Sequence, residues 1–375
     1  MYDMDEGDEA EPREKPSEVF RRYFGPEHGV ELPPRAPKFF AACVSVVFFA
    51  LAATACAAPS GACTSDGRVL KFGFYAFFKP LSYSADANPE SAGFHVHQGY
   101  EADLLNALEA MKGAGLAFSR RGIGTWKNIW LRAAGPQYDM VGGGITILAS
   151  RTLDAAGGKA VVFTSGHVAF RQSLLVRAGD AGRIRGHGDL GGARVGVLAG
   201  TTGEARLLAL TDLANSAGVL AAGARVRTPR GEALADGSAA YAIRASGASP
   251  LLAGRTSIEP PSADMPRVVY LGAKLGETEF LAALREGRVD AVARGEIGNR
   301  DAAHASGGAF AVTALDPEAE YGGFALAARD AALAACISRK LEWLTDGRRI
   351  GYRQWRADPS VFMRRARMWR MKPGR

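Results

Sequence analysis

From about residue 68 onward, short apolar runs alternate with segments whose apolar residues recur at helical spacing. The clearest helical pattern lies at 99–111, where Leu104, Leu105 and Leu108 fall on one face. We expect strands at 68–75, 116–120 and 138–142 and helices at 99–111 and 127–134. Such alternation with short connections favours a parallel sheet in an α/β fold.

The alternation starts again near residue 169. We expect strands at 169–177, 192–200, 268–271, 289–293 and 321–328 and helices at 205–210, 277–286 and 331–345, with glycine- and alanine-rich links between. Two such units with a late return segment predict two lobes joined by crossing strands. The predicted boundaries are 66–172 plus 311–355 for the first lobe, 173–310 for the second, and 356–375 for a basic tail.

The segment before these units has a different composition. Residues 1–38 are acidic and rich in proline, which is typical of a disordered leader. Residues 39–58 carry no charge, as expected of a membrane anchor or an export signal. Small residues precede Cys56, as in a lipoprotein cleavage box, so lipidation of Cys56 is one alternative and retention of the segment another. A translation start nearer residue 30 is a third.

Net charge and cysteine content narrow the possible partners. The formal net charge of +7 does not indicate an anionic ligand, because most of it comes from the tail: residues 348–375 alone contain ten basic residues and one acidic residue. The 361–372 stretch can form a basic helix that lies on a membrane or, more simply, packs on the body. Cys63 and Cys336 are the cysteines of the predicted exported body, and outside the cytosol they can pair. We expect no metal site, no cofactor and no nucleic acid partner.

The stretch 138–151 holds the most informative chemistry. An apolar strand reaches three glycines at 142–144, and Thr146 and Arg151 follow. Ligands of open α/β sheets bind at the carboxyl ends of strands, and an arginine fork suits a carboxylate. The segment Gly-Thr-Thr-Gly at 200–203 forms a second glycine turn before a helix, but it lacks the lysine of a nucleotide-binding loop.

Together these features resemble the solute-binding proteins of amino-acid ABC importers, which have the two-lobed periplasmic binding protein type 2 fold. The motifs that carry the resemblance are Phe-Lys-Pro-Leu-Ser-Tyr at 78–83, Gly-Tyr-Glu-Ala-Asp-Leu at 99–104, the 138–151 stretch, Gly-Thr-Thr at 200–202 and Gly-Arg-Val-Asp-Ala-Val at 287–292. The resemblance implies two lobes, each with a mixed, mostly parallel sheet and helices, and two crossing hinge strands.

The resemblance also implies a role for individual residues. Arg151 would bind the carboxylate of a small solute, together with the backbone amides of Thr201 and Thr202. Thr146 and the carbonyl of Gly144 would face an ammonium group, which Glu296 would neutralise. Phe78 would stack on the solute, with Trp126 and Phe74 as further candidates. The implied partners are a solute with a carboxylate, an ABC permease and the membrane, on the periplasmic or extracellular side.

Departures from the family pattern concern mainly the ammonium half of this site. Leu148 stands where family members have a second threonine. After the strand at 289–293, where an acid is usual, Arg294 and Gly295 come first and Glu296 follows, shifted by one residue. Arg294 could therefore point into the cleft and favour a more acidic ligand.

Two other functions remain open from the sequence. Cyclohexadienyl dehydratases, which convert prephenate or arogenate, share the fold and carry a glutamate in the second-lobe turn. Glu204 stands at that place and would be the general acid. A sensory solute-binding module without a permease is the other alternative.

Overall fold

The structure is a computed structural model, and it describes residues 61–65, 67–274 and 276–369. The chain divides between Ala58 and Pro59, and all described residues belong to the body that begins at Pro59. The predictions for residues 1–58, including the anchor and Cys56, lie outside the described residues.

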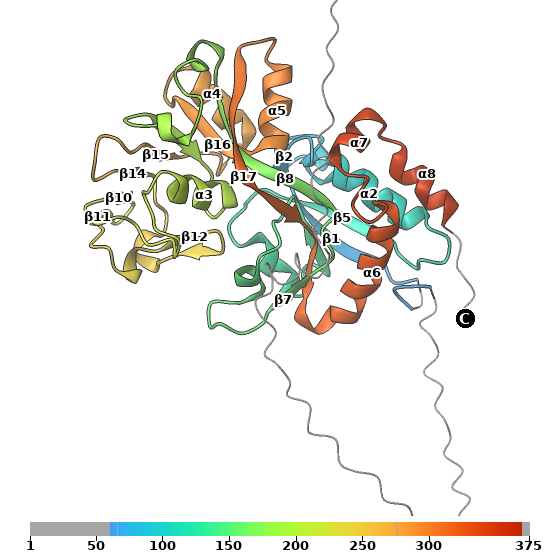
Figure 1. Cartoon of the computed structure of the whole chain (residues 1–375). Helices are drawn as coiled ribbons and strands as arrows, with labels where there is room; N and C mark the ends of the chain where they lie inside the picture. The colour runs from blue at the N-terminus through green and yellow to red at the C-terminus, as the bar shows by residue number, and fades with distance from the viewer. Residues whose placement is uncertain (1–60, 66, 275, 370–375) are drawn as a thin grey trace, which may run out of the picture. The chain divides into compact units, whose positions relative to one another are not determined.

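The first sheet has five strands in the order β5-β1-β6-β18-β7, of which β1, β5 and β7 are labelled in Figure 1. Its strands are β1 (Leu70–Tyr75), β5 (Phe118–Ile123), β6 (Met140–Gly142), β7 (Val161–Phe163) and β18 (Ala325–Ala327). Strand β1 is parallel to both β5 and β6, whereas β18 is antiparallel to β6 and β7. The late strand β18 thus lies inside a sheet formed by the beginning of the body.

Four helices accompany the first sheet: α2 (Tyr100–Ala110), α6 (Ala331–Leu344), α7 (Tyr352–Ala357) and α8 (Val361–Met368). Leu104 and Leu108 of α2 and Ile337 of α6 pack with Phe72 of β1 in one buried core. Phe362 of α8 is also fully buried in this core. The apolar face of the basic C-terminal helix therefore packs on the body.

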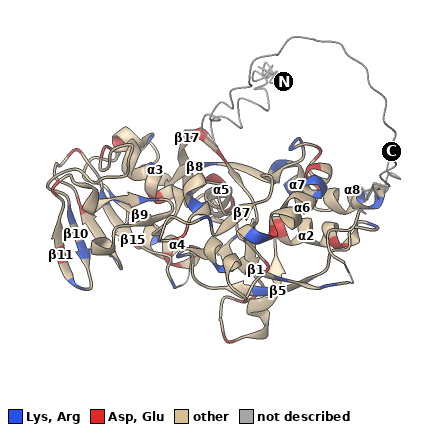
Figure 2. Cartoon of the chain, turned by 90° about the horizontal axis from the view of Figure 1, so that it is seen from below, with Lys and Arg blue, Asp and Glu red and all other residues tan. Residues whose placement is uncertain are grey.

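The second sheet has eight strands in the order β11-β10-β14-β15-β9-β16-β8-β17. They are β8 (Val168–Arg177), β9 (Arg194–Val197), β10 (Arg225–Thr228), β11 (Gly231–Leu234), β14 (Ser257–Glu259), β15 (Arg267–Tyr270), β16 (Ala291–Gly295) and β17 (Phe310–Gly322). Its helices are α3 (Thr202–Leu210), α4 (Glu277–Arg285) and α5 (Glu296–Ala305). Lys and Arg positions, blue in Figure 2, fall on β10 and α8.

Strands β8 and β17 run between the two sheets. They pair antiparallel from Arg177 to Val168, with register shifts between Val312 and Ala314 and between Leu315 and Ala319. Gly322, at the end of β17, also bridges to Thr146 beside the first sheet. These two strands are the crossing connections that the sequence predicts.

Several sequence expectations need correction. The 127–134 helix is a 3-10 helix, η2 (Ile129–Ala134), and the expected strand at 321–328 is the end of β17 followed by β18. The segment expected to be links contains β10, β11, β14 and the hairpin β12 (Ile243–Arg244) and β13 (Gly247–Ala248). Helix α5 was not expected. A further small sheet contains β2 (Phe77–Phe78), β3 (Ser82–Ser84) and β4 (His97–Gln98).

Candidate functional site

The glycine corner after β6 is closed by a buried carboxylate. Gly143 and Gly144 have φ of 128° and 71°, values that suit glycine. Their amides donate to Glu101, at 2.7 Å for Gly143 and 2.9 Å for Gly144. Glu101 lies in the first turn of α2 and is fully buried. The two amides are thus bonded within the protein, and Glu101 fixes the corner to α2.

Arg151 lies in the 3-10 helix η3 (Ala149–Thr152), and its side chain is buried. Its guanidinium donates to the carbonyls of Thr146 at 3.1 Å, Gly200 at 3.3 Å and Ala245 at 3.0 Å. The guanidinium carbon also lies 4.4 Å from the centre of the Trp130 ring. Burial lowers the pKa of Arg151 to about 10. In this conformation Arg151 links the 138–151 stretch to the glycine turn after β9 and to the β12–β13 hairpin, and it does not line the cavity described below.

Both threonines of the second glycine turn are engaged at the start of α3. Thr201 is the N-cap residue, and its hydroxyl accepts from the Glu204 amide at 3.1 Å and donates to the Leu198 carbonyl at 2.7 Å. The Thr202 hydroxyl donates to Glu320 at 2.7 Å. Both threonines line the cavity described below, and their binding of a solute stays a prediction.

Glu320 is a central residue of the cleft that sequence reasoning missed. It lies near the end of β17, beyond the second register shift. Its carboxylate accepts from Thr146 at 2.7 Å, from Thr202 at 2.7 Å and from Gln172 at 3.1 Å. Burial raises the pKa of Glu320, and these hydrogen bonds oppose the shift only in part. The protein's own carboxylate thus binds the Thr202 hydroxyl and also the side chain of Thr146, which the resemblance would place facing an ammonium group.

A cavity of about 80 Å³ lies between the two sheets beside this cluster. The predicted residues Phe78, Trp126, Gly144, Thr146, Thr201 and Thr202 line it, together with Tyr75, Phe77, Phe170, Gln172, Leu198, Gly203, Gly276, Glu277, Phe280, Arg294 and Gly295. Trp126 also donates to the Gly200 carbonyl at 2.9 Å, which joins its segment to the second glycine turn. The cavity therefore has aromatic walls and a few polar groups, an arrangement typical of small-molecule sites. Phe74 is fully buried in the core and stacks on His97 instead.

Arg294 and Glu277 form the charged part of the cavity wall. The guanidinium Nη2 lies 3.4 Å from a carboxylate oxygen of Glu277. Its Nε donates to Asn299 at 2.9 Å, and the Asn299 amide donates to Ser173 at 2.9 Å. The prediction that Arg294 can point into the cleft agrees with this geometry. Glu296, by contrast, accepts from the Arg171 amide and pairs with Arg300 at 3.1 Å, and it does not line the cavity.

Glu204, the general acid of the dehydratase alternative, is engaged elsewhere. Its fully buried carboxylate accepts from Arg255 at 2.8 Å, Tyr270 at 2.6 Å and the Gly200 amide at 2.6 Å. Burial raises the pKa of the Tyr270 hydroxyl. Glu204 does not line the cavity, so in this conformation it cannot donate a proton to a substrate bound there.

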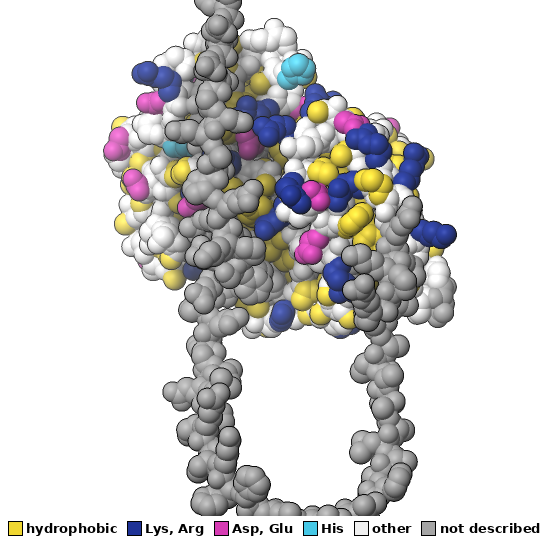
Figure 3. Space-filling model, turned by 45° about the vertical axis from the view of Figure 1, so that its right-hand side comes forward, with side chains coloured by type: hydrophobic (Ala, Val, Ile, Leu, Met, Phe, Trp, Pro, Cys, Tyr) yellow, Lys and Arg dark blue, Asp and Glu magenta, His cyan; other side chains and the backbone are white. Residues whose placement is uncertain are grey.

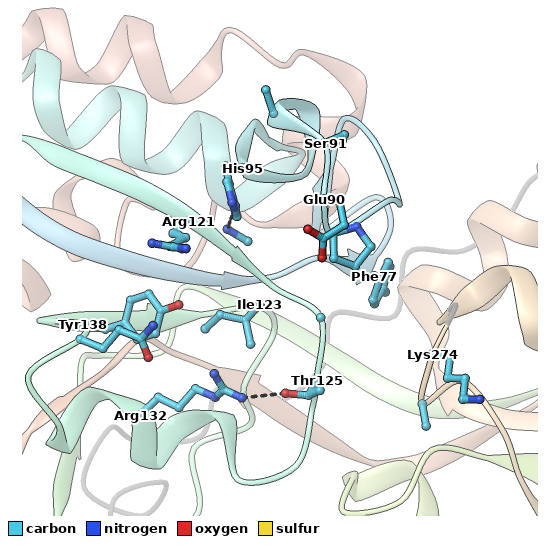
Figure 4. A pocket seen from close by; sticks show the side chains of 16 residues that line it. Phe77, Glu90, Ser91, His95, Arg121, Ile123, Thr125, Arg132, Tyr138 and Lys274 are labelled. Atoms are coloured by element: carbon cyan, nitrogen blue, oxygen red, sulfur yellow. Dashed lines mark hydrogen bonds between the residues drawn. The ribbon is translucent and has the colours of Figure 1, made fainter.

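A second, wider hollow of about 840 Å³ opens beyond the aromatic wall (Figure 4). Arg121, Arg132 and Lys274 line it, and Arg132 donates to Thr125 at 2.7 Å. Phe77 lines both spaces. On the face drawn in Figure 3, Lys and Arg side chains are scattered among hydrophobic and acidic ones.

Cys63 and Cys336 form a disulfide, with their Cα atoms 5.5 Å apart. The pairing that the sequence left open is therefore present in the structure. Among the described residues no helix is long and apolar enough to cross a membrane. In the same residues no group of three or more His, Cys, Asp or Glu is placed to hold a metal ion, and His97 bonds to Ser82 at 2.9 Å.

Comparison with known proteins gives no match to a family model or to a curated protein. An ancestral arginine-binding protein bound to arginine matches at 18% identity and a TM-score of 0.50, covering 81% of this chain and 99% of that chain. An amino-acid ABC transporter substrate-binding protein of Streptococcus pneumoniae, bound to L-arginine, matches at 14% identity and a TM-score of 0.51, covering 79% and 95%.

A third structure is an ancestral amino-acid-binding protein described as a precursor of cyclohexadienyl dehydratase. It matches at 19% identity and a TM-score of 0.48, covering 80% of this chain and 95% of that chain. At such low identity a likeness concerns the fold alone. From the first two structures and its own sheet order, the body of this chain has the two-lobed α/β fold of type 2 periplasmic binding proteins.

Proposed function

We propose that the chain is an extracytoplasmic receptor that binds a small amino-acid-like or carboxylate solute between its lobes and delivers it to an ABC permease. The observation that carries this proposal is the cavity between the two sheets, whose walls come from both. Phe78, Trp126 and Thr146 belong to the first-sheet side, whereas Thr202 and Arg294 belong to the second-sheet side. A solute that contacts both lobes favours the closed state, which is how hinge closure is driven.

Two further observations support this assignment. The two proteins of highest structural similarity described above are amino-acid-binding proteins. The disulfide between Cys63 and Cys336 is typical of oxidising compartments outside the cytosol. Attachment through residues 39–58 or through a lipid on Cys56 is part of the proposal, as are the lobe boundaries 66–172 plus 311–355 and 173–310.

A thermal-shift screen of the purified full-length chain against amino acids and small carboxylic acids tests the receptor function. A solute that binds only the folded state raises the melting temperature, by an amount that grows with its concentration. Isothermal titration of each hit should then give a stoichiometry of about one, as expected for one interlobe site. A chain that responds to none of these solutes contradicts the proposal.

The dehydratase alternative has its own test. Incubation with prephenate should leave the substrate unchanged, because Glu204 is bonded to Arg255 and Tyr270 rather than facing the cavity. Formation of phenylpyruvate above the uncatalysed rate would establish the enzyme instead.

A further inference from the structure

Three buried polar atoms of the cavity wall have no hydrogen-bond partner among the described residues. They are Nη2 of Arg294, a carboxylate oxygen of Glu277 and the amide oxygen of Gln172. All three residues line the same cavity. Two of them, Nη2 of Arg294 and the Glu277 oxygen, face each other at 3.4 Å as an ion pair that meets no hydrogen-bond geometry. Burial of a polar group without a hydrogen bond costs about 1–3 kcal/mol, so three in one cavity call for a common explanation.

Several polar groups of the residues predicted to bind a solute are, in contrast, bonded within the protein. Arg151 donates to three backbone carbonyls, and the hydroxyls of Thr146 and Thr202 donate to Glu320. The Gly144 amide donates to Glu101. The charged groups of the cavity wall are Arg294 and Glu277, and each has a buried polar atom that makes no hydrogen bond.

Arg294 is also held in a fixed orientation. Its Nε is bonded to Asn299, which is fully buried and bonded to Ser173, and the Ser173 hydroxyl donates back to the Arg294 carbonyl at 3.0 Å. A guanidinium oriented in this way loses little conformational freedom when it binds a carboxylate. Glu277 lies in the first turn of α4, with its side chain only 17% exposed.

We propose that Arg294 is the carboxylate anchor of this cleft and that Glu277 and Gln172 bind the ammonium group. This proposal rests on the proposed receptor function and names its ligand class, a small zwitterionic amino acid with an apolar side chain. The side chain lies against the aromatic wall that includes Phe78, Trp126 and Phe280. The charged contacts thus come from Arg294 and Glu277 of the second lobe, with Gln172 at the end of the first, instead of from Arg151.

Matched solutes separate the two charge contacts. We suggest calorimetric titration of the full-length chain with L-valine, isovalerate, which lacks the ammonium, and isobutylamine, which lacks the carboxylate. L-alanine, propionate and ethylamine form a smaller set. Arg294→Gln should weaken binding of the amino acid and of the acid by about 30-fold or more, the scale of a charge-assisted hydrogen bond. Glu277→Gln should weaken binding of the amino acid and of the amine while leaving the acid unaffected or better bound.

Glu296→Gln is the matched control, since Glu296 is close to Arg294 in sequence but lies outside the cavity. It should leave all affinities within about twofold. The double variant Arg294→Gln with Glu277→Gln avoids an unpaired buried charge, so it should fold even if a single variant does not. The double variant should also no longer bind the amino acid.

The outcomes are distinguishable. A wild-type chain that binds other solutes but no apolar amino acid overturns this assignment and leaves the receptor function standing. Binding of L-valine or L-alanine that survives Arg294→Gln, or survives the double variant, also overturns it. A wild-type chain that binds no solute at all overturns both proposals.

Discussion

At the scale of single residues, Glu320 shows how burial changes a carboxyl group. Its carboxylate accepts hydrogen bonds from two hydroxyls and one amide. These three bonds stabilise the charged form less than bulk water with its dissolved ions would. Because burial raises its pKa in the folded chain, the folded state favours protonated Glu320. Its contribution to stability is therefore fully present below the ordinary glutamate pKa of 4.5 and is lost as pH rises through the raised value.

Glu320→Gln should remove this pH dependence. At pH 7 we expect the variant to melt about 2 °C or more above the wild type, with the gap narrowing as pH falls toward the ordinary glutamate range. Thermal denaturation at a series of pH values checks this expectation. A gap that stays constant or widens at low pH would contradict it.

Arg151→Ala should destabilise the solute-free chain by about 3 kcal/mol, because three buried carbonyls lose their donor and Trp130 loses its stacking partner. Arg151→Lys should recover only a small part, since an ammonium cannot reach all three carbonyls. Urea denaturation without solute measures both. Unchanged stability combined with lost solute binding would contradict this expectation and support the carboxylate-binding role that the family resemblance implies for Arg151.

Six of the residues predicted to bind a solute from residue type and motif order line the cavity, among them Phe78, Trp126 and Thr202, and their contact with a solute stays a prediction. The direction of each side chain depends on tertiary packing. Arg151 donates to the carbonyl of Ala245, which lies in a hairpin that the sequence did not predict. Glu296 pairs with Arg300. Glu320 has no motif around it, and its place follows only from the irregular pairing of β17.

At the scale of elements, strands with strong apolar runs were predictable, as β1, β8 and β9 illustrate. The strands of 225–259 were not, because glycine, alanine and arginine there give weak strand propensity and no clear alternation. In the sheet, β10 lies between β11 and β14, and β14 pairs with β15, so neighbouring strands and not their own composition stabilise them.

The glycine corner gives an element-scale prediction with a matched control. Gly144→Ala adds a Cβ that would lie 2.6 Å from Leu81 and 2.7 Å from Phe78, in addition to backbone strain at φ of 71°. Gly157 has a similar φ of 82° but open space around the position of a Cβ. We expect Gly157→Ala to cost about 1 kcal/mol and Gly144→Ala about 1–3 kcal/mol more. Equal losses in chemical denaturation would show that the corner is not tightly packed.

At the scale of the whole molecule, the disulfide joins residues separated by 273 positions. It attaches the start of the body to α6, where the Lys340 ammonium also donates to the Gly61 carbonyl at 2.7 Å. The two-lobed plan and the crossing strands were predictable from the repeated alternation of elements. The sheet order of the second lobe was not, because three of its eight strands, β10, β11 and β14, lie outside that alternation.

Replacing Cys63 and Cys336 with serine should lower the free energy of unfolding by about 3 kcal/mol, since the long loop in the unfolded chain is no longer closed. Denaturation of the wild type with and without dithiothreitol should show the same difference. The double-serine variant should be insensitive to the reductant, and a wild type that is equally insensitive would contradict the prediction.

The position of β18 between β6 and β7 has a consequence for the order of synthesis. During synthesis, residues 70–163 leave the ribosome long before Ala325 does. The first sheet therefore lacks its inner strand β18 during the whole time in which the second lobe is synthesised. The second sheet, in contrast, needs nothing after Gly322. The lobe that begins first is therefore completed last, and a chain truncated before β18 would expose the facing edges of β6 and β7 to other chains.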